Sequence, residues 1–235
     1  MKNNIIHLEQ IDSTNAELKR RAAQGAADGT VVWADEQTAG RGRLNRSWLS
    51  EKSKGALFSL LLRGRSEGLV FRCALAAAQV LRDLTGADIL VKWPNDIVLH
   101  GKKLAGILCE AAIMGDDEVW MIAGIGVNLL ETHFPEDLPW AGSVLSETGL
   151  KLDAYEFIVK WLTAFNEIQS MSIGEVLNSL IPISATIGNR VRAGEIEGMA
   201  EGFDADGSLI IRAEDGVHKI IVGDVSVRGI MGGYT

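Results

Sequence analysis

Apolar residues in the first part of the chain recur with the two spacings that distinguish strands from helices. The runs 5–11 and 30–35 combine β-branched, apolar and polar residues in the manner of strands. Between them, Thr14 followed by Glu17 resembles a capping box that begins a helix, which we expect to end near Gly25. A strand, a helix and a second strand are therefore predicted in this order.

A long polar loop follows the second strand. It covers residues 36–55, and the apolar run 56–62 after it is typical of another strand. Apolar residues then recur at helical spacing over 71–81, and Gly86 is suited to end that helix. The loop is thus expected to project from the end of a sheet, where binding loops are often found.

Strand patterns without intervening helices dominate the middle of the chain. Turn signals at Pro94-Asn95, at Gly101 and at 115–117 separate these runs by only a few residues. Such short connections predict a meander of antiparallel hairpins rather than parallel β-α-β units. The predicted strands cover 87–93, 96–100, 103–114 and 118–129.

The last third begins with helices and ends with short strands. After a segment rich in proline and tryptophan at 134–140, helical patterns cover about 153–170 and 173–180. From Ser184, short alternating runs separated by glycine-containing turns predict a β-barrel of about 50 residues, near the lower size for an independent core. We therefore expect two domains, 1–183 and 184–235.

The composition limits the class of protein. With 235 residues, of which 47% are hydrophobic and 23% charged, the chain can bury a sizeable core, and disorder is excluded. It contains neither a run of about 20 apolar residues nor the apolar segment of a secretory signal, which favours a cytoplasmic protein without a membrane anchor. The net charge of −8 argues against a general DNA-binding protein.

The cysteines and histidines give no sign of a metal site. Cys73 and Cys109 lie inside apolar runs, where small buried thiols are expected rather than a disulfide or metal ligands. The four histidines are scattered along the chain without the spacing of metal ligands. No metal-binding residue is therefore predicted.

The loop 39–48 is the most informative local feature, because it concentrates basic residues in an acidic protein. Arg41, Arg43 and Arg46 carry planar guanidinium groups that match carboxylate and phosphate oxygens, and Gly40 and Gly42 permit unusual backbone conformations. A solvated basic loop would have the same composition. Its predicted place at the end of a sheet favours an anion-binding loop.

A second cluster lies within the predicted hairpins. The turn after 87–93 and the hairpin through Gly101 bring Lys103 back towards Asp96, so Lys103 could serve as a point charge for a phosphate or carboxylate. An exposed hairpin salt bridge is the structural alternative. The run 124–128 (GIGVN) is too short for a dinucleotide fingerprint, and its glycines favour a strand that a ligand approaches closely. Walker A, Gly-x-Ser-x-Gly and kinase motifs do not occur.

Five motifs in order resemble the catalytic domain of the biotin protein ligase family. They are DSTN (12–15), QTAGRGRLNRSW (37–48), KWPND (92–96), KLAGIL (103–108) and GIGVN (124–128). The tail VSVRG (225–229) is similar to the small SH3-like C-terminal domain of that family. The resemblance implies an α/β (α+β) fold, in which helices pack on a mixed, largely antiparallel sheet, and a small SH3-like β-barrel follows.

The resemblance also implies an activity. Such an enzyme activates biotin with ATP and Mg²⁺ as biotinyl-5′-AMP and then transfers biotin to one lysine of a biotin carboxyl carrier protein domain. Three residue sets are carried over from the matching motifs. Biotin-binding residues would be Ser13, Thr14, Asn15, Gln37, Arg41, Gly42, Arg43, Lys103, Gly106, Gly124 and Gly126; adenylate-binding residues Arg43, Arg46, Trp48, Lys103 and Asn128; and catalytic residues Lys103, Arg43, Arg46 and Asp96.

Other functions stay open from the sequence. A lipoate or octanoate protein ligase would share the fold and the acyl-adenylate chemistry, and a non-catalytic biotin-responsive regulator or repressor would share the biotin site. Because the chain begins directly on the first predicted strand, the resemblance favours the form of the enzyme without a DNA-binding segment. An exposed strand edge in the meander could pair two copies as a homodimer.

Overall fold

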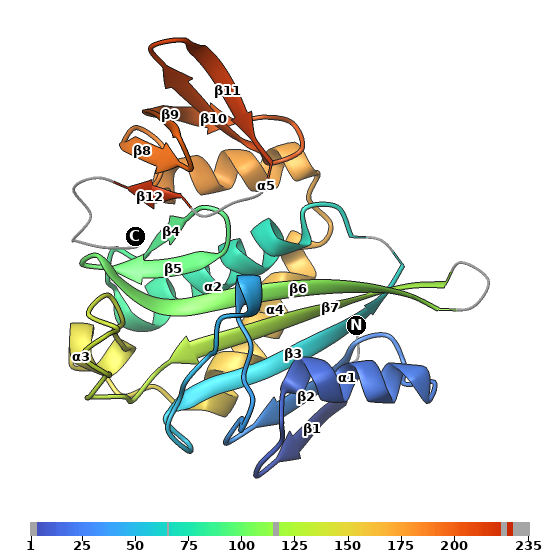
Figure 1. The fold of residues 1–235 in the computed structure, drawn as a ribbon. Helices are drawn as coiled ribbons and strands as arrows, with labels where there is room; N and C mark the ends of the chain where they lie inside the picture. Colours follow the sequence, from blue (N-terminus) through green and yellow to red (C-terminus); the bar gives the residue numbers. More distant parts are fainter. Residues whose placement is uncertain (1–3, 65, 115–117, 222–224, 228–235) are drawn as a thin grey trace.

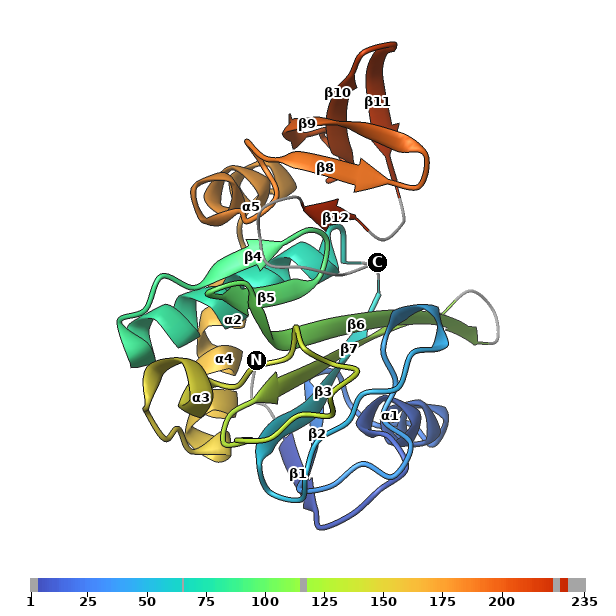
Figure 2. The ribbon, with the colours of Figure 1, turned by 60° about the vertical axis from the view of Figure 1, so that its left-hand side comes forward.

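The computed structural model describes residues 4–64, 66–114, 118–221 and 225–227 (Figure 1). A seven-stranded mixed sheet forms the larger part, and a second sheet lies beyond it with the C-terminal residues (Figures 1 and 2). None of the helices in these ranges has the length and apolar character to cross a membrane.

The large sheet has the strand order β1-β2-β3-β7-β6-β5-β4. The first two strands are parallel, as α1 between them requires, and every other neighbouring pair is antiparallel. The predicted meander is therefore confirmed. The strands are β1 Asn4–Leu8, β2 Thr30–Ala34, β3 Gly55–Arg63, β4 Leu90–Lys92, β5 Asp96–Leu99, β6 Lys102–Met114 and β7 Glu118–Asn128.

Helices cover both faces of this sheet. Helix α1 (Thr14–Ala23) packs Leu18 and Ala22 on one face, against β2, β3 and β7. Helices α2 (Leu69–Thr85), α4 (Ala154–Ile168) and α5 (Ile173–Leu180) lie on the other side, where α2 contacts both α4 and α5 (Figure 2). The apolar residues of β3 point alternately to the two sides, so nearly the whole strand is buried.

The start of α1 differs from the prediction. Ser13 is the N-cap residue, its side chain makes no capping hydrogen bond, and Thr14 is already the first helical residue. Glu17 accepts hydrogen bonds from Arg20 and Arg21 on the same helix instead of closing a capping box. The expected capping box is therefore wrong, because Thr14 has another partner within the candidate site.

Some short helical elements were not predicted. Helix α3 (Val144–Thr148) begins at Ser143, which accepts a hydrogen bond from the Ser146 backbone nitrogen. A single 3₁₀ turn follows α5 at Ile181–Ile183. Five residues are too few for helical periodicity to be recognised in the sequence.

The C-terminal strands form a second, antiparallel sheet in the order β11-β10-β9-β8-β12. Among the described residues no pairing joins β11 to β12, so these strands make an open sheet there rather than the closed barrel that we expected. Their bounds are β8 Arg190–Ala193, β9 Ile196–Phe203, β10 Leu209–Ala213, β11 Gly216–Ile220 and β12 Ser226–Val227.

The C-terminal sheet is joined to the large sheet through Trp93. The Trp93 backbone nitrogen donates to Thr186 Oγ1 at 3.0 Å, and its indole nitrogen donates to the Gly207 carbonyl oxygen at 3.0 Å. Gly207 has a φ of +83° and packs so closely on Phe71 of α2 that a side chain there would overlap the ring. The position of the turn that follows Trp93 is thus fixed through both the backbone and the side chain of Trp93.

Candidate active site

A cavity of about 130 Å³ lies between the loop 39–48, the central strands β6 and β7, and the turn after β4. A second cavity of about 330 Å³ adjoins it and shares part of its wall, including Trp48 and Lys103. Of the residues singled out from the sequence, Asn128 borders only the second cavity. The first is lined by Ser13, Thr14, Asn15, Gln37, Arg41, Gly42, Arg43, Arg46, Trp48, Asp96, Lys103, Gly106, Gly124 and Gly126, among others.

Glycines form part of the floor of the first cavity. Gly106 of β6 is paired with Gly126 of β7, and a Cβ atom at these positions would lie 2.9 Å and 2.6 Å from the Trp48 indole ring. A side chain at Gly124 would overlap the Asn15 amide. We expected a ligand to approach these glycines; in the structure the groups that do so are two protein side chains, and Trp48 lies where the two cavities meet.

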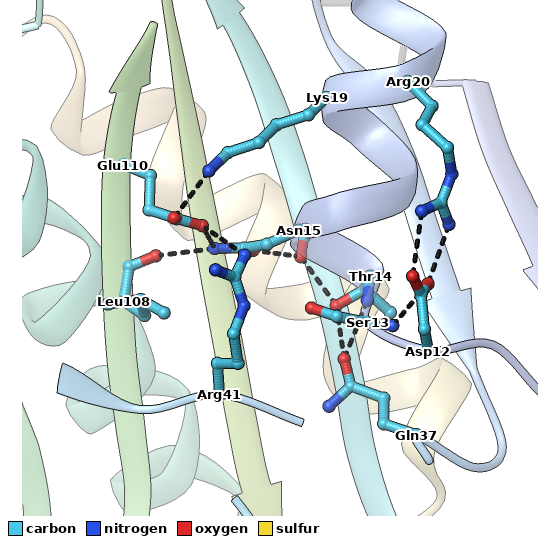
Figure 3. Close-up of polar contacts among 11 residues, drawn as sticks. Asp12, Ser13, Thr14, Asn15, Lys19, Arg20, Gln37, Arg41, Leu108 and Glu110 are labelled. Atoms are coloured by element: carbon cyan, nitrogen blue, oxygen red, sulfur yellow. Dashed lines mark hydrogen bonds and ion pairs between the residues drawn. The ribbon is translucent and has the colours of Figure 1, made fainter. Parts of the chain in front are cut away.

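A chain of polar contacts lines the end of the cavity beside α1 (Figure 3). Gln37 Oε1 accepts from the Thr14 backbone nitrogen at 2.8 Å and from Thr14 Oγ1 at 3.0 Å. Ser59 Oγ, fully buried on β3, lies 2.7 Å from Thr14 Oγ1 and donates to Asn15 Oδ1 at 2.6 Å. Sequence reasoning missed Ser59, whose only signal was a polar residue inside an apolar strand.

Glu110 of β6 gathers three donors next to this chain (Figure 3). Lys19 Nζ lies 2.6 Å and Asn15 Nδ2 2.7 Å from its carboxylate, and Arg41 Nη2 lies at 3.4 Å. Burial alone would raise the pKa of Glu110, but the hydrogen bonds from Lys19 and Asn15 outweigh it and lower the pKa. Glu110 thereby connects α1 to the first arginine of the loop. It too was missed, although it interrupts an apolar strand.

Asp12 fixes the turn before α1 on the outer side (Figure 3). Its two carboxylate oxygens accept from Arg20 Nη1 and Nη2 at 2.9 and 2.7 Å, and Asp12 Oδ1 also accepts from the Ser13 backbone nitrogen. The hydrogen bonds from Arg20 lower the pKa of Asp12 to about 2. The strand-to-helix turn that presents Thr14 is thereby tied to the helix itself.

Lys103 and Asp96 meet at the other end of the cavity. The hairpin brings Lys103 Nζ to 2.7 Å from Asp96 Oδ1, with side chains only 16% and 13% exposed, so this is not the exposed surface pair considered as an alternative. Lys103 Nζ also lies 5.6 Å from the centre of the Trp48 ring and 5.9 Å from that of Trp140. A largely buried cation between two aromatic rings is suited to meet an anionic ligand.

The arginine loop is a folded hairpin with a 3₁₀ turn at Arg43–Asn45. The Gly42 nitrogen donates to the Arg46 carbonyl at 2.7 Å, and the Trp48 nitrogen donates to the Gly40 carbonyl at 3.0 Å. Leu44 at its tip has a φ of +54° and is 65% exposed. Arg43 Nη1 donates to Asn95 Oδ1 at 3.0 Å, and Arg41 Nη2 lies 3.4 Å from the Glu110 carboxylate.

Described residues near the site offer no cluster of three histidine, cysteine, aspartate or glutamate side chains that could hold a metal ion. The site instead combines polar groups at one end, a glycine floor under an aromatic ring, and cations at the other end. Such an arrangement can hold an elongated ligand with a polar head, an apolar stem and an anionic tail.

Comparison with known families identifies the family of the chain. Residues 7–128 match the model of the biotin/lipoate A/B protein ligase family, and residues 186–228 match the biotin protein ligase C terminal domain. The chain belongs to the biotin/lipoate A/B protein ligase family. All five motifs quoted from the sequence lie within the first match, and the family resemblance is confirmed.

Relatives of this ligase family match along nearly the whole chain. The biotin--[acetyl-CoA-carboxylase] ligase of Paracoccus denitrificans is 33% identical over 94% of this chain and all of that protein. The bifunctional ligase/repressor BirA of Bacillus spizizenii is 33% identical over 97% of this chain and 75% of that protein. The biotin protein ligase of Aquifex aeolicus in complex with biotin and ATP has 32% identity and a TM-score of 0.84, covering 97% and 99% of the two chains.

Proposed function

We propose that this chain is a biotin protein ligase, which forms biotinyl-5′-AMP from biotin and ATP and transfers the biotin to a lysine of a carrier domain. The observation that supports this most is the order of groups along the first cavity: Thr14 and Gln37 at one end, the glycine floor in the middle, and Lys103 at the other. Biotin has the same order, with a urea head, an aliphatic chain and a carboxylate.

In the first step a biotin carboxylate oxygen attacks the α-phosphorus of ATP, and the bond to pyrophosphate breaks. Attacking and attacked groups are both anionic, so a cation between them lowers the barrier. Lys103 would supply that charge at the carboxylate and α-phosphate, and Arg43 and Arg46 would bind the phosphates. Mg²⁺ arriving with ATP would neutralise further phosphate charge. The protein residues contribute positioning as well as charge.

In the second step the amine of the carrier lysine attacks the carbonyl carbon of the adenylate, and AMP leaves. The amine must first lose a proton, and Asp96, ion-paired with Lys103 at 2.7 Å, would accept that proton or orient the amine. No enzyme side chain forms a bond to biotin in this scheme. The arginine loop would cover the adenylate and keep water away until the carrier arrives.

The acceptor is the carrier domain of a biotin-dependent carboxylase, and the reaction takes place in the cytoplasm. The name of the Paracoccus denitrificans relative, biotin--[acetyl-CoA-carboxylase] ligase, supports a carboxylase acceptor. The C-terminal match favours biotin over lipoate, because the description of that second family names biotin protein ligase.

A labelling experiment tests this function. The protein is incubated with ATP, an apo-carrier domain, and either radiolabelled biotin or radiolabelled lipoate; a carrier with arginine in place of its target lysine is the control. We expect biotin to enter only the lysine-containing carrier. Incorporation of lipoate would instead indicate a lipoate ligase, and biotin binding without any incorporation would indicate a regulator.

A further inference from the structure

A chain of hydrogen bonds runs from Glu110 on β6 to Thr14 at the wall of the first cavity (Figure 3). Asn15 and Ser59 are its links. The Glu110 Oε2–Asn15 Nδ2 distance is 2.7 Å, Asn15 Oδ1 lies 2.6 Å from Ser59 Oγ, and Ser59 Oγ lies 2.7 Å from Thr14 Oγ1. Ser59 is fully buried, and Asn15 and Thr14 are each only 4% exposed. Bulk water therefore competes little for these bonds, and the groups orient one another.

Glu110 fixes the orientation of the Asn15 amide. The lowered pKa of Glu110 keeps its carboxylate ionised at neutral pH, so it can only accept hydrogen bonds. Asn15 accordingly turns its Nδ2 to Glu110 Oε2 and to the Leu108 carbonyl oxygen at 3.3 Å. The reverse orientation would place Asn15 Oδ1 against two acceptors. Lys19 Nζ binds the other carboxylate oxygen, Oε1, at 2.6 Å.

The orientation of Asn15 decides where two hydroxyl hydrogens go. Asn15 Oδ1 can only accept, so Ser59 donates its single hydrogen there and has none left for Thr14. The Thr14 hydroxyl hydrogen then goes to one of two protein acceptors, Ser59 Oγ at 2.7 Å or Gln37 Oε1 at 3.0 Å. In both cases Thr14 Oγ1 offers a ligand a lone pair but no hydrogen.

Gln37 supplies the opposite polarity at the same end of the cavity. Its Oε1 accepts from the Thr14 backbone nitrogen at 2.8 Å, so its Nε2 is the group left to donate to a ligand. Thr14 and Gln37 thus present an acceptor beside a donor. A urea carries the matching pair, an N–H group next to a carbonyl oxygen, whereas the dithiolane ring of lipoate carries neither.

We infer that Glu110 is a positioning residue for recognition of the ligand head group: its negative charge sets the direction of the hydrogen-bond chain, so that Thr14 accepts from an N–H group of the ligand. The inference rests on the proposed function, in which that ligand is biotin. Without the charge, Asn15 could turn over and donate to Ser59, which would then donate to Thr14. The Thr14 hydrogen would no longer be taken by Ser59 and could be donated to a ligand acceptor.

Biotin analogues with oxygen in place of one or the other urea N–H group test the inference. Calorimetry without ATP gives the Kd of biotin and of both analogues for wild type and for Glu110→Gln, whose neutral amide can accept from or donate to Asn15. In wild type, the analogue that lacks the N–H group facing Thr14 should bind about 10- to 100-fold more weakly than biotin. In Glu110→Gln this ratio should fall by about 5-fold or more, because Thr14 can then donate to the ring oxygen.

Two control variants separate the direction of the chain from the loss of an ion pair. Lys19→Met removes the cation at the other carboxylate oxygen and leaves the charge of Glu110 in place. Glu17→Gln removes a carboxylate from α1, the helix that carries Asn15. Both variants should keep the wild-type ratio. An equal change in Lys19→Met would show that Glu110 acts only by tethering the helix, and an unchanged ratio in Glu110→Gln would also overturn the inference.

The Ser59→Ala background tests the path, because Ser59 links Asn15 to Thr14. In that background Glu110→Gln should leave the ratio unchanged, and a second full decrease would show that its effect reaches the ligand by another route. Equal binding of biotin and both analogues by wild type would overturn the inference even if Glu110→Gln did not fold. Absence of biotin transfer to the carrier, with the expected binding ratios, would instead refute the ligase activity and leave the role of Glu110 standing.

Discussion

Replacing Lys103 by alanine should separate the catalytic role of this lysine from its structural one. The lysine forms a largely buried ion pair with Asp96 and lies beside two tryptophan rings. If Lys103 neutralises charge at the reacting atoms, its loss removes one donor from the transition state. Removal of a single such donor lowers kcat by about 10²- to 10³-fold, and we expect that decrease in pyrophosphate release.

The same substitution has a cost in stability that follows from burial. Side chains that are 16% and 13% exposed are too enclosed for water to replace the lost partner of Asp96 fully. When one member of a buried ion pair is removed and the other stays, the free energy of unfolding falls by about 3 kcal/mol. For a chain of this size, that loss lowers the melting temperature by roughly 6–12 °C. The variant should therefore be folded at 25 °C but less stable.

The double variant Lys103→Ala/Asp96→Asn distinguishes the two effects. It removes the unpaired carboxylate, so much of the lost melting temperature should return while pyrophosphate release stays low. Both quantities are measured on the same preparations, by thermal unfolding and by pyrophosphate release at 25 °C. Wild-type release from a folded Lys103→Ala protein would refute a role in catalysis, and recovery of release in the double variant would show that instability alone caused the loss.

Three further predictions concern the loop and its anchors. The Arg43→Gly variant should still form the adenylate, but the residence time of the adenylate on the enzyme should fall by about 10- to 100-fold. The released adenylate should then attach biotin to an added serum albumin, and equal labelling of albumin by wild type would contradict this. Trypsin should cleave between Gly40 and Trp48 more slowly when biotin and ATP are saturating, because their anions would bind the loop arginines, and unchanged cleavage would count against closure. The lowered pKa of Glu110 means that its stabilising contribution is present above its unfolded pKa and lost as pH falls through the folded value. The difference in melting temperature between wild type and Glu110→Gln should thus be largest near pH 7 and decrease as the pH falls below the unfolded pKa of the carboxyl, and a constant difference would show that charge is not involved.

The sequence predicts the long elements of this fold well. Runs with a clear period of two or 3.6 residues, such as those of β3 and α2, are found close to where the pattern put them. The pattern failed at Thr14, where local spacing indicated a cap but a residue of the next loop, Gln37, provides the hydrogen bond instead. Thr14 and Gln37 are 23 positions apart, so the spacing of nearby residues could not predict their hydrogen bond.

The candidate site was predicted from motifs, which explains both what was found and what was missed. Every motif residue proposed for biotin lines the first cavity, and Lys103 reaches Asp96 as the hairpin predicted. Ser59 and Glu110 belong to none of the five motifs, and their significance depends on burial and on partners far along the chain. Leu44 in the arginine loop has a left-handed backbone conformation. Leucine ordinarily disfavours that conformation, so residue preferences could not have predicted its position in the loop.

The two hydrogen bonds of Trp93 make the C-terminal sheet part of the active-site scaffold. Asn95 and Asp96 follow Trp93 within three positions, and the groups that hold Trp93 come from Thr186 and Gly207. A substitution more than 90 positions away in the sequence could therefore displace the residues that meet Arg43 and Lys103. In a mutational survey, harmful substitutions around Thr186 and Gly207 would therefore change the catalytic rate as active-site variants do. A shortened chain without the C-terminal sheet would be a poor template for inhibitor design.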